Sequence, residues 1–237
     1  MQRFHAVRRA DGEFFGTEPV WKILLRIAPP VMLAQLIQAL YNVVDSFFVG
    51  RYSGDGLTAP SVIYPIQLII TALAVGTGVG VNTQMSRLYA KGRTEAANKT
   101  GGAGILLALV MWALFTAIIL PILRPFSEAS ATSPAAVEDA VVYGTICCAG
   151  SVGVFCESIF SKIHQARGNM LLPMIAQIAG ALVNIVLDPV LIFGWGAIPQ
   201  MGVAGAAWAT VLGQVTAAVI TGVRGFRKPP ALRRIWR

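Results

Sequence analysis

Charged residues are scarce in this chain of 237 residues. Asp, Glu, Lys and Arg make up 13% of the sequence, against about 25% in an ordinary soluble domain, whereas 55% of the positions are hydrophobic. The mean hydropathy is +0.65. This composition argues against a soluble globular domain and is typical of a membrane protein.

Histidine and cysteine are also scarce, with two and three copies. We expect His5 and His164 outside the membrane, so no buried Ser–His pair is available to an intramembrane protease, and the motifs HExxH and the nucleophile elbow are absent from the sequence. Cys147, Cys148 and Cys156 share one apolar stretch without histidine at metal-ligand spacing, which disfavours a zinc site or a disulfide framework. We therefore expect neither an enzyme nor a cofactor, and cysteines that pack as small apolar residues.

The sequence contains long apolar runs. A hydrocarbon core of about 30 Å needs about 20 apolar residues of helix, and six runs of this kind occur, at about 27–50, 60–85, 101–123, 137–161, 171–195 and 202–223. They lack the alternation of barrel strands, so helices must satisfy their backbone in lipid. The sequence predicts an all-α membrane protein in which residues 27–223 form a six-transmembrane-helix bundle. Residues 1–26 and 224–237 are the expected cytoplasmic N- and C-terminal segments.

The basic residues predict the orientation of this bundle. Seventeen of the 19 lysines and arginines fall before the first run, after the last run, or between runs two and three and runs four and five; Arg51 and Arg124 remain for the other side. By the positive-inside rule both termini are cytoplasmic, as expected for a bacterial inner membrane protein. The net charge of +8 then reflects topology, and nucleic-acid binding is disfavoured because no soluble domain or aromatic platform uses the charge.

Polar residues inside the runs are the candidate functional residues, since they are costly in lipid and usually face a cavity or a partner. They follow one face of four helices: Gln35, Gln38, Asn42 and Asp45; Tyr64 and Gln67; Gln177, Asn184 and Asp188; Thr210 and Gln214. Counting 1.5 Å per residue from the predicted outer ends places Asp45, Asp188, Gln67 and Thr210 within a few ångströms of one level. We expect the four stripes to meet in the outer half of the membrane.

The two aspartates are harder to explain by packing than the amides. A lone intramembrane Gln, Asn or Thr is more often a contact between helices than a ligand, but two carboxylates at one depth favour a site. Pro189 is predicted to kink its helix and free a backbone carbonyl one turn below; it could equally only shape the packing. With Asn184, Asp188 and Thr210, that carbonyl would supply hard oxygen donors for a sodium ion or a shared proton.

Glu157 is assigned a different role. It lies about four residues before the predicted cytoplasmic end of the fourth run, with Lys162 nearby. We expect a carboxylate that snorkels or pairs with the loop, and not a site.

Three stretches resemble one transporter family. "PPVMLAQLIQALYNVVDSFFVGRY", "GVGVNTQMSRLYAKG" and above all "LVNIVLDPVLIFGWGAIPQMGVAGAAWATVLGQ" are similar to prokaryotic members of the multidrug and toxin extrusion (MATE) family. The resemblance implies a secondary antiporter that exports organic, often cationic, compounds in exchange for sodium ions or protons. It also implies that Asp45, Asn184 and Asp188 take part in cation coupling with Thr210 beside them. We place Gln38, Asn42, Tyr64 and Gln67 on the expected substrate pathway.

MATE transporters have twelve helices in two similar lobes, and the six runs here correspond to the N-terminal lobe. The chain is therefore expected to be a truncated or fragmentary product, or to pair with a second lobe or a second copy of itself, in contact with the lipid bilayer and a small organic cation. Two alternatives stay open. A lipid or oligosaccharide flippase of related fold would favour a cationic cavity, but Lys and Arg are nearly absent from the middles of the runs; a non-transporting membrane fragment is the other.

Overall fold

The structure is a computed structural model that describes residues 19–52, 57–196 and 199–227. Its helices are α2 (Val20–Tyr52), α3 (Thr58–Ala90), α4 (Thr94–Ser130), α5 (Pro134–Gly150), α6 (Val152–Ala166), α7 (Leu171–Phe193) and α8 (Val203–Arg227). Within these ranges, six stretches of helix are long and apolar enough to cross a membrane, with α5 and α6 together forming one of them. The predicted all-α, six-span membrane fold is confirmed. Most of the two expected terminal segments lies outside the described residues.

Short polar turns end the helices where the sequence changes direction. Gly92 and Gly168 have positive φ angles of 70° and 83°, which residues with a side chain rarely adopt. Each directly follows the C-cap residue of its helix. At the opposite end of the bundle, the Ser133 side chain accepts a hydrogen bond of 3.1 Å from the backbone N–H of Ala136 and caps α5. These turns reverse the chain between spans and keep consecutive spans antiparallel.

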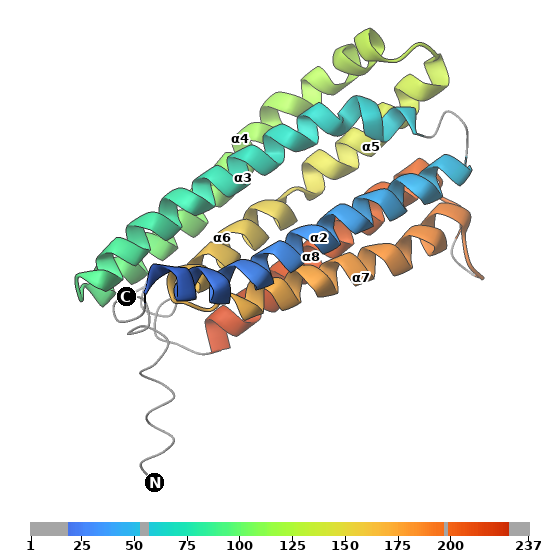
Figure 1. Ribbon diagram of the computed structural model, residues 1–237. Coiled ribbons are helices and arrows are strands. Elements are labelled where there is room, and N and C mark those ends of the chain that lie inside the picture. Colours follow the sequence, from blue (N-terminus) through green and yellow to red (C-terminus); the bar gives the residue numbers. More distant parts are fainter. Residues whose placement is uncertain (1–18, 53–56, 197–198, 228–237) are drawn as a thin grey trace.

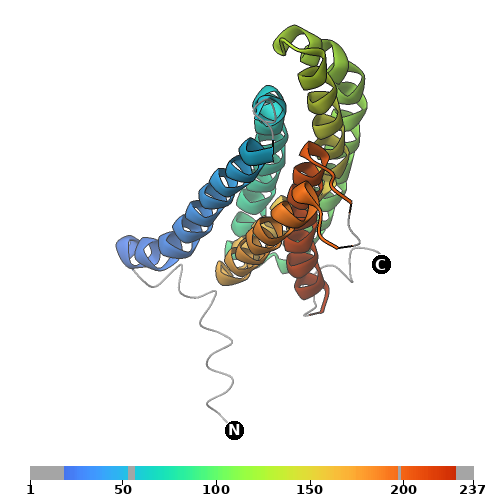
Figure 2. The same ribbon diagram turned by 90° about the vertical axis from the view of Figure 1, so that its right-hand side faces the viewer.

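The helices pack in two groups joined by the fourth span (Figures 1 and 2). α2, α7 and α8 lie side by side, α3 lies along α4, and α5 and α6 contact members of both groups. Ile63, Met85 and Phe155 are fully buried in the core between them. α7 and α8 are in close backbone contact at Gly180 and Gly213, where a Cβ on either glycine would lie 2.6 Å from the carbonyl oxygen of the other, and again at Gly205, where a Cβ would lie 2.5 Å from the carbonyl oxygen of Leu191. These contacts between backbones bring together the two helices that carry Asn184, Asp188 and Thr210.

The fourth span differs from the single helix predicted at 137–161. It is divided at Gly150 and Ser151 into α5 and α6. The carbonyl of Cys148 accepts hydrogen bonds from the hydroxyls of Ser151 (2.7 Å) and Thr116 (3.2 Å), and the Trp112 indole donates to the next carbonyl at 3.2 Å. Hydroxyl side chains can bind backbone carbonyls in place of backbone N–H groups. Here these three side-chain donors bind carbonyls at the point where the helix is interrupted.

The proline in the fifth span has no such effect on helix continuity. α7 runs through Pro189 as one helix from Leu171 to Phe193. The kink predicted at Pro189 stays a prediction, because helix continuity does not decide the angle between the two parts.

Candidate functional site

Two adjacent helices bring three of the predicted residues into hydrogen-bonding distance. The side-chain amide of Asn184 on α7 donates to Oδ1 of Asp188, one turn further along the same helix, at 3.5 Å and to the Thr210 hydroxyl on α8 at 3.3 Å. Asp188 is completely buried, and Asn184 and Thr210 are 2% and 8% exposed. The Gly180–Gly213 contact allows this geometry, because Asn184 is one turn after Gly180 and Thr210 is about one turn before Gly213.

Asp45 on α2 completes the group. α2 packs along α7, and the Asp45 carboxyl is buried and within electrostatic reach of Asp188. Three oxygen atoms of this group are buried without a hydrogen-bond donor: Oδ1 of Asp45, Oδ1 of Asn184 and Oδ2 of Asp188. Buried acceptors of this kind are rare in folded proteins because they lose their water without replacement. We call Asp45, Asn184, Asp188 and Thr210 the carboxylate cluster.

The donor set of the carboxylate cluster fits a small hard cation. Carboxylate, amide and hydroxyl oxygens suit hard ions, and a positive charge near Asp45 and Asp188 would offset the repulsion between these two like charges. Within the described ranges, no group of three or more His, Cys, Asp or Glu residues could hold a metal ion. The cluster therefore lacks the nitrogen and sulfur ligands that zinc or copper prefers.

Tyr41 also belongs to this region, and the sequence analysis missed it. Its phenol is within electrostatic reach of both Asp45 and Asp188. The available signal was its spacing, since Tyr41 precedes Asp45 by four residues and so shares the face of α2 that carries the aspartate. Aromatic residues in apolar runs usually indicate packing, and the polar spacing pattern did not include tyrosine on this helix.

The side-chain contacts of Gln67 join α3 to α5. Its amide lies 3.4 Å from the hydroxyl of Tyr143 and 3.7 Å from the Sγ atom of Cys147, both buried on α5. Tyr143 is itself within electrostatic reach of Asp45, so Gln67 is connected to the carboxylate cluster through α5. Cys147 is buried as predicted for a packing residue, but it also accepts this hydrogen bond.

The remaining residues of the expected substrate pathway are more exposed. Gln38 is half-buried, Asn42 is exposed, and 57% of Tyr64 is exposed. No hydrogen bond joins these three side chains to the carboxylate cluster in the part of the chain that the structure describes. Their place on a substrate pathway stays a prediction.

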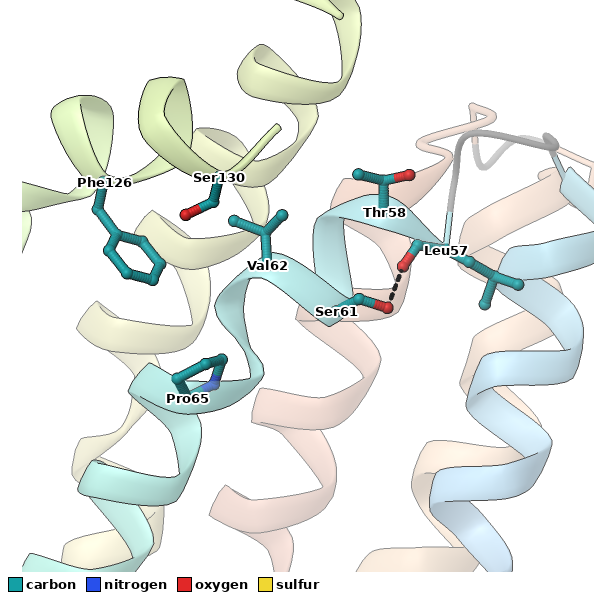
Figure 3. Close-up of a pocket in the computed structure, with 7 residues that line it drawn as sticks. All are labelled: Leu57, Thr58, Ser61, Val62, Pro65, Phe126 and Ser130. Atoms are coloured by element: carbon teal, nitrogen blue, oxygen red, sulfur yellow. Dashed lines mark hydrogen bonds between the residues drawn. The ribbon is translucent and has the colours of Figure 1, made fainter. Parts of the chain in front are cut away.

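A shallow pocket of about 500 Å³ opens near the N-terminus of α3 (Figure 3). Seven residues from the start of α3 and the end of α4 line it: Leu57, Thr58, Ser61, Val62, Pro65, Phe126 and Ser130. Its wall includes none of the predicted functional residues, and its polar contact is local, a 2.6 Å hydrogen bond from Ser61 to the carbonyl of Leu57. This pocket is therefore separate from the carboxylate cluster.

Curated relatives share this architecture over about half of their own length. The chain is 27% identical over 207 residues to the FAD transporter of Shewanella oneidensis, matching 86% of this chain and 45% of that protein. It is 27% identical to the probable multidrug resistance protein NorM of Thermotoga maritima, over 90% of this chain and 46% of the relative. The multidrug export protein MepA of Staphylococcus aureus is 28% identical, over 87% and 45%.

Solved structures and a family model agree with these relatives. The chain superposes on a MOP superfamily transporter from Pyrococcus furiosus with a TM-score of 0.81 and 28% identity, over 90% of this chain and 47% of that one. A multidrug resistance MATE family transporter in an outward-facing conformation gives the same TM-score, identity and coverage. The family model described as MatE matches residues 30–190. The family consists of transport proteins and not of enzymes, and the chain belongs to it: this is a multi-pass membrane protein of the MatE family.

Proposed function

We propose that the chain forms one lobe of a secondary antiporter that exports small organic cations, coupled to entry of a sodium ion or a proton. The carboxylate cluster is the proposed coupling site. Asp45 and Asp188 supply charge, Asn184 supplies its carbonyl oxygen, and Thr210 fixes the Asn184 amide through their 3.3 Å hydrogen bond. The function rests above all on the three buried oxygens of Asp45, Asn184 and Asp188 that have no donor.

Coupling between cation binding and helix movement follows from the positions of the proposed ligands on different helices. Asp45 is on α2, whereas Asn184, Asp188 and Thr210 are on the tightly packed pair α7 and α8. When both carboxylates are charged they repel each other across the α2–α7 contact; a cation between them removes the repulsion and draws the helices together. Two arrangements of α2 relative to α7 and α8 then differ in cation affinity, which is the requirement for an ion to drive a conformational change.

The substrate class and topology are proposed on the same grounds. Buried carboxylates and the scarcity of lysine and arginine within the spans favour an organic cation over an anion. Both termini are proposed to be cytoplasmic because of the distribution of basic residues. Alternating access needs one bundle to move against another, so the proposed partner is a second lobe, on another copy of the chain or another polypeptide.

Cation binding tests the site without requiring transport. The full chain is reconstituted in liposomes, and binding of radioactive sodium is measured by scintillation proximity over a range of pH. Protons and sodium should compete for the cluster. The double variant Asp45→Asn and Asp188→Asn is expected to have a sodium affinity at least about tenfold lower, because amides carry no charge. The change of its sodium binding with pH should also be smaller.

Asp139→Asn is the matched control, since Asp139 is a half-buried aspartate on α5 outside the cluster. It should bind sodium like the unaltered chain. Unchanged, saturable and pH-dependent binding in the double variant would disprove the proposed coupling site. Efflux of ethidium from cells that express the chain, together with cross-linking, then tests whether paired copies export.

A further inference from the structure

Glu157 lies further from the end of its helix than the sequence suggested. The expectation was a carboxylate about four residues from the helix end, but α6 continues to Ala166, nine residues beyond Glu157. At 1.5 Å per residue that is about 14 Å. The fourth span has 33 residues and is about 50 Å long, which exceeds a hydrocarbon core of about 30 Å, so its end does not mark the membrane surface. That Glu157 snorkels stays a prediction.

Neutral side chains make the direct contacts with Glu157. The Ser161 hydroxyl donates to Oε1 of Glu157 at 2.5 Å, and Gln177 on α7 interacts with the same carboxylate. Lys162 is within electrostatic reach, but its ammonium donates to the Gln165 side chain at 3.1 Å. The expected loop pairing with Lys162 is not found within 4.0 Å among the described residues.

The helices packed against α6 do not supply a stronger partner. α3, α4, α5, α7 and α8 all contact α6, and Lys162 is the charged group that acts on Glu157 among the described residues. From α3, Asn82 donates to the backbone carbonyl of Lys162 at 2.8 Å; from α8, the backbone of Gln214 lies against Gly153, one turn before Glu157. A half-buried carboxylate without a direct counter-ion among the described residues carries a desolvation penalty, which binding a proton removes.

α7 connects this position to the carboxylate cluster. Gln177, which interacts with Glu157, is seven residues before Asn184 on α7, an axial distance of about 10 Å. Both groups of polar residues thus contact one helix, with Gln177 six residues after the start of α7 and Asp188 five residues before its end. A helix that moves when a cation binds at Asp188 also moves Gln177 relative to Glu157.

We propose that Glu157 is a second protonation site of the lobe, which binds and releases one proton during the transport cycle. On uptake a hydronium ion from the cytoplasmic side gives its proton to Oε2 of Glu157, an O–H bond forms, water is left, and the carboxylate becomes neutral. Release reverses each change. Movement of α7 alters the Gln177 contact, which stabilises the charged form, and so shifts the balance between the two states. The role in a cycle rests on the proposed function, whereas the titration of Glu157 does not.

Infrared difference spectroscopy between acidic and alkaline buffer measures this titration directly, through the C=O stretch of protonated carboxyl groups. The full chain is reconstituted in liposomes with glutamate labelled by ¹³C at the side-chain carboxyl, which separates glutamate bands from aspartate bands. Glu157→Gln is expected to remove the signal of one carboxyl group from the glutamate bands. Glu128→Gln is the control for an exposed glutamate, and Glu157→Asp should restore one titrating carboxyl among the aspartate bands.

The outcomes separate this proposal from that of the carboxylate cluster. In the double variant Asp45→Asn and Asp188→Asn, the Glu157 band should persist, even if sodium binding proves independent of the cluster. Unaltered glutamate bands in Glu157→Gln would overturn the proposal. If that variant does not fold, Ser161→Ala decides, because loss of its hydrogen bond must shift the frequency of a titrating Glu157 band; glutamate bands identical to those of the unaltered chain would again overturn it.

Discussion

Gly213→Ala should disturb the carboxylate cluster from a position that binds nothing itself. The new Cβ would lie 2.6 Å from the carbonyl oxygen of Gly180 and 3.2 Å from Cβ of Asn184. Restoring ordinary van der Waals contact requires α7 and α8 to separate by about 0.8 Å, since rigid backbone atoms face each other. The hydrogen bond from Asn184 to Thr210 is 3.3 Å long, so a movement of this size breaks it.

Two measurements follow from this geometry. Overpacking of this kind costs about 1–3 kcal/mol of stability, and loss of the hydrogen bond that orients Asn184 should lower sodium affinity about tenfold. Thermal unfolding in detergent and the sodium-binding assay report the two effects. Gly76→Ala is the matched control on α3, where a Cβ meets nothing within 4 Å. Wild-type stability and affinity in Gly213→Ala would refute the argument that the glycine contact positions the cluster.

Three further substitutions test individual contacts. Thr210→Val removes the acceptor of the Asn184 amide and should weaken sodium binding about tenfold, whereas Thr210→Ser should retain most of it; equal binding by the two variants would contradict the assigned role. Ser133→Ala removes the cap of α5 and should destabilise the chain by about 1 kcal/mol in thermal unfolding, with sodium affinity unchanged. Trp112→Phe leaves the carbonyl of Ala149 without its indole donor at the break between α5 and α6 and should cost about 1–3 kcal/mol; no loss of stability would show that the indole does not support the break.

Hydrophobicity and spacing were sufficient to predict the six spans and much of the carboxylate cluster. Apolar runs must become helices in lipid because the backbone has no other partner there. Helix rise predicted Asp45, Asp188 and Thr210 at one level together with Gln67, and helix spacing predicted Asn184 on the same face as Asp188. The structure joins Asn184, Asp188 and Thr210 by hydrogen bonds with Asp45 close by. The functional role of these residues stays a proposal.

Contacts between helices were not predictable in the same way. Tyr41 resembled a packing residue until the structure placed it within electrostatic reach of both aspartates. The position of Glu157 within its helix was not predictable because the end of a helix in an apolar run cannot be read from hydropathy, and α6 ends at Ala166 instead of near residue 161. The break at Gly150 and Ser151 likewise depends on donors from α4, which lie more than 30 residues away in the sequence.

The amino-acid sequence by itself determined that this protein is a six-span helical membrane protein, because backbone hydrogen bonding in lipid and helix periodicity act locally along the chain. Its family was indicated separately, by the resemblance of three stretches to MATE transporters. Tertiary structure alone decided which polar atoms are left without partners among the described residues: Oδ1 of Asp45, Oδ1 of Asn184 and Oδ2 of Asp188 at one site, and a half-buried Glu157 without a directly contacting counter-ion at another. Whether a buried polar group is satisfied depends on every helix that packs around it, and no single helix contains that information.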